Sequence, residues 1–154
     1  LILVDLKTMD AGEYEAEPFY KAGADICTVL GASGIATIKG VIAAAKKYGK
    51  ECQVDMINVD DKESLAKEAV AAGADIIGVH TGLDAQAAGH TPFADLAAIA
   101  ALNTGAKISV AGGVKAATAQ EVKDAGAAII VAGAAIYGAA DPAAAAAEIT
   151  SIAH

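Results

Sequence analysis

Short apolar runs rich in valine and isoleucine alternate along the chain with longer stretches of helical periodicity. The apolar runs predict strands at Leu1–Leu6, Asp25–Leu30, Glu51–Met56, Asp75–His80, Lys107–Ala111 and Ala128–Ala132. The intervening stretches predict helices at Glu13–Lys21, Ile35–Tyr48, Lys62–Ala71, Pro92–Leu102 and Thr118–Asp124. A last helix is predicted at the C-terminus, with Asp141 as its N-cap and Pro142 at its first position. Nearly continuous apolar strands that alternate with helices are typical of a parallel sheet covered by helices, so the pattern predicts an α/β protein.

An internal repeat narrows the architecture. The segment Ala-Gly-Ala-Asp-Ile at 22–26 recurs at 72–76 and, as Ala-Gly-Ala-Ala-Ile, at 125–129, so the offsets are 50 and 53 residues. Such a segment is also simply a good helix-to-strand turn, because glycine suits the end of a helix. In either case, a regular spacing of about 25 residues per strand–helix unit favours a (β/α) barrel over an open Rossmann sheet.

Six predicted strands are fewer than the eight of a closed (β/α)8 TIM-type barrel. The chain opens inside an apolar run and ends with a capped helix, so the first two βα units are expected to be absent from it. We therefore interpret residues 1–154 as a single, N-terminally incomplete barrel domain that holds strands three to eight. A six-stranded open sheet is the alternative.

Composition and charge exclude several classes of protein. Of the 154 residues, 55% are hydrophobic, which is enough for a core and rules out disorder. Charged residues interrupt the apolar runs well before the length of a membrane span, and a net charge of −8 without arginine predicts no nucleic-acid partner. Cys27 and Cys52 lie in apolar runs and are predicted to be buried free thiols. With no secretory signal visible, a cytoplasmic location is expected.

Polar side chains gather where the first strand ends. Asp5 and Lys7 are two residues apart, so strand alternation places them on one face, and Asp10 completes an Asp-x-Lys-x-x-Asp pattern. The opposite face, toward the helices, is expected to hold Ile2, Val4 and Leu6. A carboxylate and an ammonium in a barrel mouth are costly unless they are paired or bind a ligand or metal. A salt bridge that closes the top of the barrel is the structural alternative.

Two further candidate residues lie at the ends of later strands. Asp55 lies at the end of the predicted strand Glu51–Met56, and His80 ends the predicted strand Asp75–His80. A histidine in that position can serve either the structure or acid–base chemistry.

Glycines follow the last two strands. Gly112-Gly113 and Gly133-Ala134 lie where backbone N–H groups can bind an anion, at the usual phosphate site of such barrels. Tight turns are the alternative reason for these glycines.

These residues resemble a known family. The segment Asp5–Gly12 closely resembles the Asp-x-Lys-x-x-Asp motif of the orotidine 5′-monophosphate decarboxylase superfamily. Within it, the 3-hexulose-6-phosphate synthase family is similar to this chain at Val54–Ile57, Gly78–Gly89, Ala111–Val114 and Gly138–Pro142. The resemblance runs over the whole chain.

The resemblance implies a magnesium- or manganese-dependent aldolase, a homodimer with shared active sites. The enzyme would join formaldehyde to D-ribulose 5-phosphate, a sugar phosphate, through a metal-stabilised enediolate, giving D-arabino-3-hexulose 6-phosphate. It also implies that Asp5 is a metal ligand and that Lys7 stabilises the enediolate. Asp10 would reach into the neighbouring subunit's site, Asp55 would belong to the acid–base set, and His80 would act in proton transfer.

By the same resemblance, the backbone at Gly112, Gly113, Gly133 and Ala134 would hold the phosphate. In the family, an Asp on the first strand and a Glu metal ligand on the second complete the site, and both are expected to lie outside this chain. An inactive fragment that serves as a phosphate-binding or interface module is therefore the non-enzymatic alternative.

The related 3-keto-L-gulonate-6-phosphate decarboxylase family is the enzymatic alternative. That family tends to have Glu where this chain has Asp55, Arg where it has Leu83 and Thr where it has Ala111. A shorter carboxylate and an apolar Leu83 deliver protons and water to the enediolate less well, which favours capture by formaldehyde. Drift at tolerant positions is the other explanation of these differences.

Overall fold

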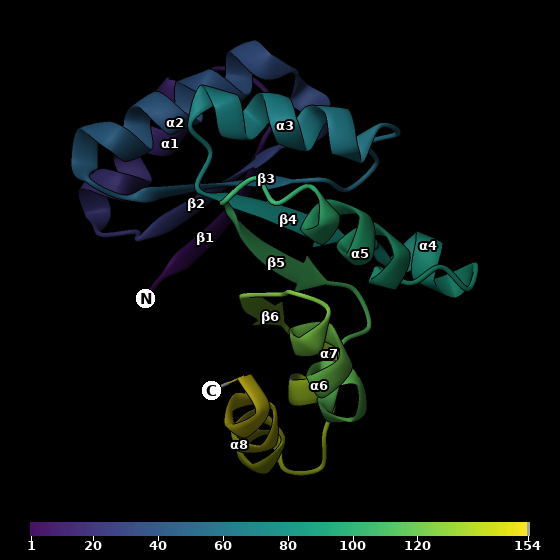
Figure 1. The fold of residues 1–154 in the computed structure, drawn as a ribbon. Helices are drawn as coiled ribbons and strands as arrows, with labels where there is room; N and C mark the ends of the chain where they lie inside the picture. Colours follow the sequence, from purple (N-terminus) through teal and green to yellow (C-terminus); the bar gives the residue numbers. More distant parts are fainter. Residues whose placement is uncertain (154) are drawn as a thin grey trace. The chain divides into compact units, whose positions relative to one another are not determined.

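The computed structural model describes residues 1–153, and His154 lies outside the described residues. The strands are β1 (Leu3–Thr8), β2 (Ile26–Leu30), β3 (Glu51–Asp55), β4 (Ile76–His80), β5 (Lys107–Ala111) and β6 (Ile129–Val131) (Figure 1). The helices are α1 (Gly12–Ala22), α2 (Ile35–Tyr48), α3 (Lys62–Ala72), α4 (Leu83–Ala87), α5 (Phe93–Ala101), α6 (Ala116–Asp124), α7 (Ala134–Tyr137) and α8 (Pro142–Ala153), with a 3-10 turn, η1 (Gly31–Ser33).

The strands follow one another in sequence order across the sheet, from β1 to β6. The pairs β1–β2, β2–β3, β3–β4 and β5–β6 are parallel. A sequential parallel order is the order of a (β/α) barrel, whereas a doubly wound sheet reverses its order at a switch point. Each strand and long helix predicted from periodicity is present, and α4, α7 and η1 are short elements outside the predicted ranges.

The chain divides into two compact units, and each is described by itself. The first contains Leu1–Gly78 with Leu102–Ala106, and the second contains Val79–Ala101 with the chain from Lys107 onward. In the first unit, α1, α2 and α3 lie on the same face of the strands (Figure 1). The interpretation of residues 1–154 as a single domain stays a prediction.

Alternation along β2 and β3 gives the first unit two different faces. The face toward the helices carries fully buried apolar side chains, among them Cys27, Val29, Cys52 and Val54. The opposite face carries buried polar side chains, namely Thr28, Gln53 and Asp55. Because apolar packing already fills the helix side, the polar face is where this unit can hold chemistry.

The start of β1 differs from the prediction. The strand begins at Leu3 and runs to Thr8, instead of Leu1 to Leu6, and Ile2 is 61% exposed instead of covered by helices. Within the described residues β1 is the first strand in the order and pairs with β2 alone. The described residues of this unit therefore leave most of Ile2 uncovered.

Two glycines let α1 and α2 cross closely. A Cβ at Gly40 would lie 2.8 Å from the backbone nitrogen of Glu13, and a Cβ at Gly12 would overlap the carbonyl oxygen of Thr37. Both neighbours are backbone atoms, which cannot move aside without separating the helices.

We therefore expect Gly40→Ala to destabilise the chain, although alanine is the better helix former. The helix-propensity gain is about 1 kcal/mol, and overpacking against the backbone costs about 1–3 kcal/mol, so a net loss is expected. Urea unfolding measures the change. A variant as stable as the wild type would show that α1 and α2 are not held at this distance.

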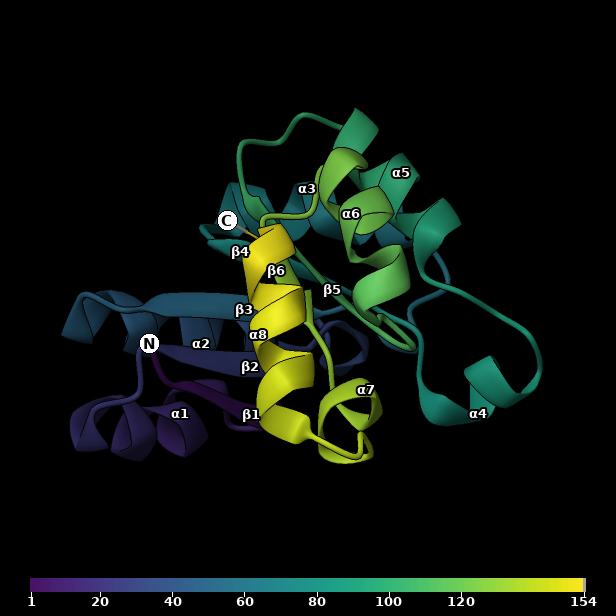
Figure 2. The same ribbon diagram turned by 90° about the horizontal axis from the view of Figure 1, so that it is seen from below.

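The second unit packs β5 and β6 against its own helices. Helix α6 contacts both β6 and α8, and α7 contacts α8 (Figures 1 and 2). The carboxylate of Asp141 caps α8 by accepting a hydrogen bond from the N–H of Ala144 at 3.0 Å, with Pro142 as the first helical residue. Both roles were predicted from the sequence.

Both cysteines are buried and free, as predicted. They are direct register partners on β2 and β3. The Tyr20 hydroxyl beside them donates to the carbonyl of Glu51 at 2.8 Å and accepts from the N–H of Cys27 at 3.3 Å. Burial raises the pKa of the Cys27 and Cys52 thiols and of the Tyr20 hydroxyl, so all three are neutral in the folded chain at neutral pH.

These raised pKa values predict a loss of stability at alkaline pH. A thiol ionises near pH 9.0 when the chain is unfolded and only at a higher pH in the fold, so its contribution to stability is complete below pH 9.0 and falls as the pH rises above it. Each thiol adds a slope of about 1.4 kcal/mol per pH unit. Urea unfolding between pH 8 and 10.5 should show a shallower decline for Cys27→Ala/Cys52→Ala than for the wild type. Equal slopes would contradict burial of the thiols.

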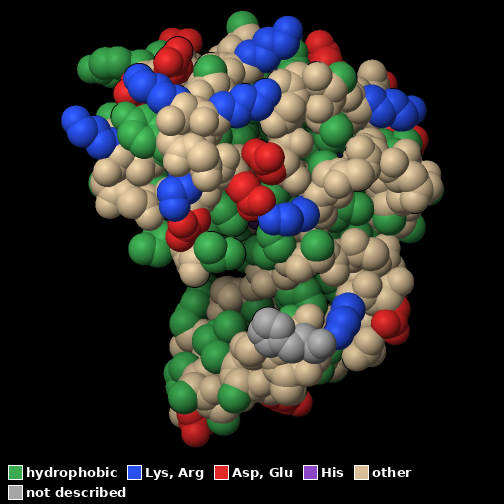
Figure 3. Space-filling view, turned by 60° about the vertical axis from the view of Figure 1, so that its left-hand side comes forward, with side chains coloured by type: hydrophobic (Ala, Val, Ile, Leu, Met, Phe, Trp, Pro, Cys, Tyr) green, Lys and Arg blue, Asp and Glu red, His purple; other side chains and the backbone are tan. Residues whose placement is uncertain are grey.

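The surface offers two further observations. Among residues 1–153, no helix combines the length and the apolar character needed to span a membrane. On the face in Figure 3, lysine side chains stand singly among acidic and uncharged side chains and do not merge into one basic area.

Candidate functional site

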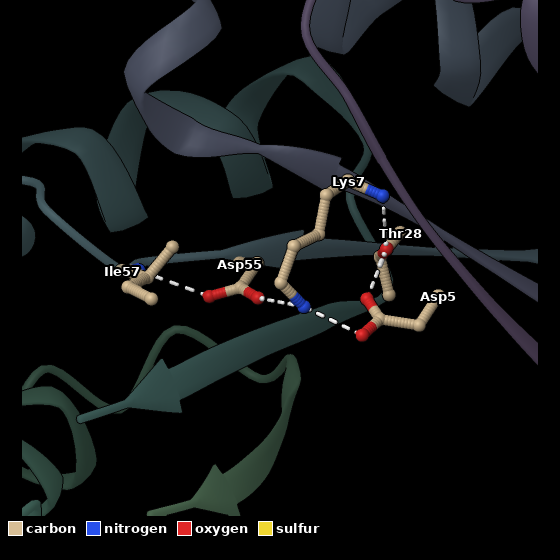
Figure 4. Close-up of polar contacts among 5 residues, drawn as sticks. All are labelled: Asp5, Lys7, Thr28, Asp55 and Ile57. Atoms are coloured by element: carbon tan, nitrogen blue, oxygen red, sulfur yellow. Dashed lines mark hydrogen bonds and ion pairs between the residues drawn. The ribbon is translucent and has the colours of Figure 1, made fainter. Parts of the chain in front are cut away.

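An ion-pair cluster lies on the polar face of the first unit. The ammonium Nζ of Lys7 is 2.5 Å from Oδ2 of Asp5 and 3.3 Å from Oδ2 of Asp55 (Figure 4). The N–H of Ile57 donates to the other oxygen of Asp55 at 2.9 Å. The Asp55 side chain is only 4% exposed, so this charge needs the partners it has. The structure thus brings together three of the residues predicted for the site.

The charge state of Lys7 follows from these contacts. Partial burial works to lower the pKa of the ammonium, but the hydrogen bond to Asp5 and the negative charges of Asp55 and Asp5 outweigh it. The pKa is therefore raised above the usual 10.5, and Lys7 is a cation at neutral pH. The contact is also the salt bridge that the sequence offered as a structural alternative.

The backbone of β1 brings Lys7 to Asp5 in a way that simple alternation does not. Lys7 has a positive φ of 48°, in the left-handed region that side chains other than glycine rarely adopt. The register of β1 on β2 shifts between Val4 and Thr8. Sequence reasoning assumed a regular strand, and the period-two pattern carries no signal for this bulge.

The ion-pair cluster of Asp5, Lys7 and Asp55 partly fits a divalent metal ion. Its carboxylate oxygens are the donors that Mg²⁺ prefers, and two carboxylates around one ammonium leave a formal charge of −1 for a cation to compensate. Among the described residues, however, no group of three or more His, Cys, Asp or Glu side chains could hold a metal. Mg²⁺ sites commonly use one or two carboxylates with water and substrate, so Asp5 fits as one ligand of a larger set.

Asp10 is not part of this cluster. It is exposed, and its Oδ1 accepts a hydrogen bond from the N–H of Ala11 at 2.8 Å. Ala11 itself has a positive φ of 49° at the start of α1. The role of Asp10 in a neighbouring subunit's site stays a prediction.

The predicted phosphate-binding glycines meet at one end of β5 and β6 in the second unit. Ala111 and Val131 are register partners, so Gly112-Gly113 and Gly133-Ala134 follow on adjacent strands. The φ values of Gly112 and Gly113 are +115° and +72°. Among the described residues, the N–H groups of Gly113, Gly133 and Ala134 donate to no protein acceptor. This is a set of adjacent free donors, as an anion site requires.

Thr81 and Gln86, which were not singled out from the sequence, shape the turn at Gly112-Gly113. A Cβ at Gly112 would lie 2.5 Å from the carbonyl oxygen of Thr81, and that carbonyl accepts a hydrogen bond from Nε2 of Gln86 at 2.7 Å. The N–H of Thr81 donates to the carbonyl of Ala111 at 3.1 Å. Both missed residues lie inside the segment Gly78–Gly89, whose resemblance to the synthase family was the available signal. His80, the last residue of β4, is half-buried.

Comparisons with known proteins agree on one family. The model of the orotidine 5′-phosphate decarboxylase/HUMPS family matches residues 1–149. The chain is 74% identical to 3-hexulose-6-phosphate synthase of Methylomonas aminofaciens, over 99% of this chain and 73% of the relative. It is 50% identical to the synthase of Mycobacterium gastri, over 97% of this chain and 72% of the relative. The chain thus spans just under three quarters of these relatives.

Solved structures give the same result. The 3-hexulose-6-phosphate synthase of Salmonella typhimurium superposes with a TM-score of 0.94 at 42% identity, over 98% of this chain and 72% of that one. A 3-keto-L-gulonate-6-phosphate decarboxylase (KGPDC) of Streptococcus mutans has a TM-score of 0.88 at 26% identity, over 99% of this chain and 72% of that one. These likenesses confirm the partial (β/α) TIM-type barrel and favour the synthase over the decarboxylase.

Proposed function

Because the chain belongs to the orotidine 5′-phosphate decarboxylase/HUMPS family, we propose that it carries out the 3-hexulose-6-phosphate synthase reaction. In this reaction D-ribulose 5-phosphate and formaldehyde condense to D-arabino-3-hexulose 6-phosphate. The single observation that supports this most is the Lys7 ammonium held between Asp5 and Asp55 at the end of β1, in a chain 74% identical to a synthase.

The chemistry needs a group that stabilises negative charge on oxygen. Carbon 1 of the sugar phosphate loses a proton, its electron pair forms a bond to the carbon of formaldehyde, and the formaldehyde oxygen takes up a proton. The intermediate enediolate is negatively charged. Lys7 is cationic at neutral pH and preorganised by two carboxylates, so it is suited to stabilise that charge.

We assign the proton transfers to Asp55 and His80, which end neighbouring strands β3 and β4. Asp55 is deeply buried beside the Lys7 ammonium, and an imidazole can both accept and donate a proton.

The backbone after β5 and β6 is assigned to the phosphate. The free N–H groups of Gly113, Gly133 and Ala134, with the turn at Gly112, would bind the phosphate oxygens without any arginine. This agrees with a chain that has no arginine at all.

A divalent ion, Mg²⁺ or Mn²⁺, is part of the proposal, with Asp5 as one of its ligands. When bound, such an ion supplies Lewis-acid stabilisation of negative charge on the substrate oxygens. The Asp5 carboxylate is positioned for this because Thr28 holds one of its oxygens.

The active assembly is proposed to be a homodimer in which Asp10 serves the neighbouring subunit's site. Asp10 is exposed just before α1, as such a role requires. The unpaired thiols of Cys27 and Cys52 agree with a reducing compartment such as the cytoplasm.

The proposal is tested by formaldehyde-dependent consumption of ribulose 5-phosphate, with Mg²⁺ and then with EDTA. This chain and the complete gene product are assayed side by side. Activity that EDTA abolishes is expected. Release of carbon dioxide from 3-keto-L-gulonate 6-phosphate without synthase activity would instead identify the decarboxylase, and silence in both assays would favour the inactive module.

A further inference from the structure

Thr28 contacts the backbone of Lys7 directly and is linked to the Lys7 ammonium through Asp5. Its Oγ1 accepts a hydrogen bond from the backbone N–H of Lys7 at 2.9 Å and donates one to Oδ1 of Asp5 at 2.8 Å. The other oxygen of Asp5 binds Nζ of Lys7 at 2.5 Å. The contacts therefore form a closed ring that leaves the Lys7 backbone, passes through Thr28 and Asp5, and returns to the Lys7 side chain (Figure 4).

The bulge in β1 explains why a side chain is needed at this point. Val4 pairs with Cys27 and Thr8 pairs with Val29, so three residues of β1 lie against the single residue Thr28 of β2. The regular ladder cannot serve an N–H inside such a bulge. The hydroxyl of Thr28 takes the place of the missing backbone acceptor and so supports the left-handed conformation of Lys7.

The hydroxyl also sets the orientation of Asp5. A threonine hydroxyl has one proton to donate, and here the proton is directed to Oδ1 because the N–H of Lys7 occupies an acceptor position on the same oxygen. Thr28 is only 1% exposed, so its hydroxyl is shielded from solvent. Oδ2 of Asp5 is left facing Lys7.

From this ring we infer that Thr28 is a positioning residue for the reaction, acting through Asp5 and Lys7. The kinetic consequence of this inference rests on the proposed function, whereas its structural consequence, the positioning of Asp5 and Lys7, rests on the described contacts alone. Thr28 ends no strand and matches no quoted motif, so sequence reasoning did not single it out.

The kinetic test compares Thr28→Val, which removes the hydroxyl at nearly constant size, with Thr28→Ser, which keeps it. We expect Thr28→Val to lower kcat about 10- to 100-fold with KM for ribulose 5-phosphate within about twofold, because the group that stabilises the enediolate is displaced while phosphate binding is not. Thr28→Ser should restore kcat to within about threefold of the wild type.

Thr8→Val is the matched control. Thr8 is equally buried, at 1% exposed, and its Oγ1 has no hydrogen-bond partner among the described residues. The same chemical change there should leave kcat within about threefold. An equal loss of kcat in Thr8→Val and Thr28→Val would overturn the inference, because it would show a general effect of altering a buried threonine.

A second readout does not depend on the reaction. Acetylation of the lysines, followed by peptide mass spectrometry, reports how strongly Lys7 is held, with the exposed Lys39 as internal reference. The Lys7/Lys39 ratio should rise at least about threefold in Thr28→Val and stay unchanged in Thr28→Ser and Thr8→Val. An unchanged ratio in Thr28→Val would overturn the inference even if the wild type proves inactive, whereas an inactive wild type with the expected ratio would overturn only the proposed function.

Discussion

Lys7→Met is expected to lower kcat for hexulose-phosphate formation by about 10³-fold, the largest loss we expect from any single change in this chain. Methionine keeps most of the length of the side chain and removes the cation that lies 2.5 Å from Asp5 and 3.3 Å from Asp55. The negative charge that develops on the sugar oxygens then loses its preorganised partner. Steady-state kinetics with the purified, folded variant gives the measurement.

The same variant should also be less stable, because Asp55 keeps a buried charge without its counter-ion. We expect a loss of about 1–3 kcal/mol, the lower end being set by the third of the Lys7 side chain that is in solvent. The double variant Lys7→Met/Asp55→Asn should regain stability but not activity. A Lys7→Met variant that keeps more than a tenth of the wild-type kcat would show that Lys7 does not stabilise the intermediate.

Gly112→Ala is expected to raise KM for ribulose 5-phosphate about 10- to 100-fold, the range for one or two lost hydrogen bonds to a charged phosphate. The new Cβ would lie 2.5 Å from the Thr81 carbonyl oxygen, and the φ of +115° adds strain. The turn must shift, and the free N–H groups beside it shift as well. Inhibition by inorganic phosphate should weaken in parallel.

Gly105→Ala is the matched control for this change. Gly105 has a comparable positive φ of +84°, but nothing lies within 4 Å of an added Cβ. Its KM should therefore stay within about twofold of the wild type, even if the backbone strain lowers stability. If Gly112→Ala remains folded with an unchanged KM, the phosphate is not bound at the end of β5.

Much of the fold is predictable because its signals are local. Valine- and isoleucine-rich runs place all six strands, and Lys107–Ala111 and Ile35–Tyr48 agree with the structure to the residue. The carboxylate at Asp141 caps α8 as its position before Pro142 predicts. The short helix Leu83–Ala87 was not predicted, because a helix of five residues is too short to show a helical pattern of apolar positions.

The candidate site is predictable where residue type alone points to chemistry. Asp5, Lys7 and Asp55 are charged residues at strand ends, and they meet as expected. Thr28 is a β-branched residue in an apolar strand, which is ordinary β-sheet composition, so nothing in the sequence marks its hydroxyl. The left-handed φ of Lys7 is equally hidden, because it depends on the register of β1 against β2.

The error at Ile2 has a related cause. Alternation assigns a face to each residue of a strand, but burial also requires a neighbouring element to cover that face. Since β1 pairs with β2 alone in the described residues, Ile2 is left 61% exposed.

The most direct test of the central claim is proton exchange at carbon 1 of ribulose 5-phosphate in D₂O, followed by proton NMR without formaldehyde. If the site around Lys7 stabilises an enediolate, the carbon 1 proton should exchange with solvent in the presence of Mg²⁺, and the exchange should disappear in Lys7→Met. Formaldehyde-dependent product formation by the wild type without any such exchange, or undiminished exchange in Lys7→Met, would contradict the account.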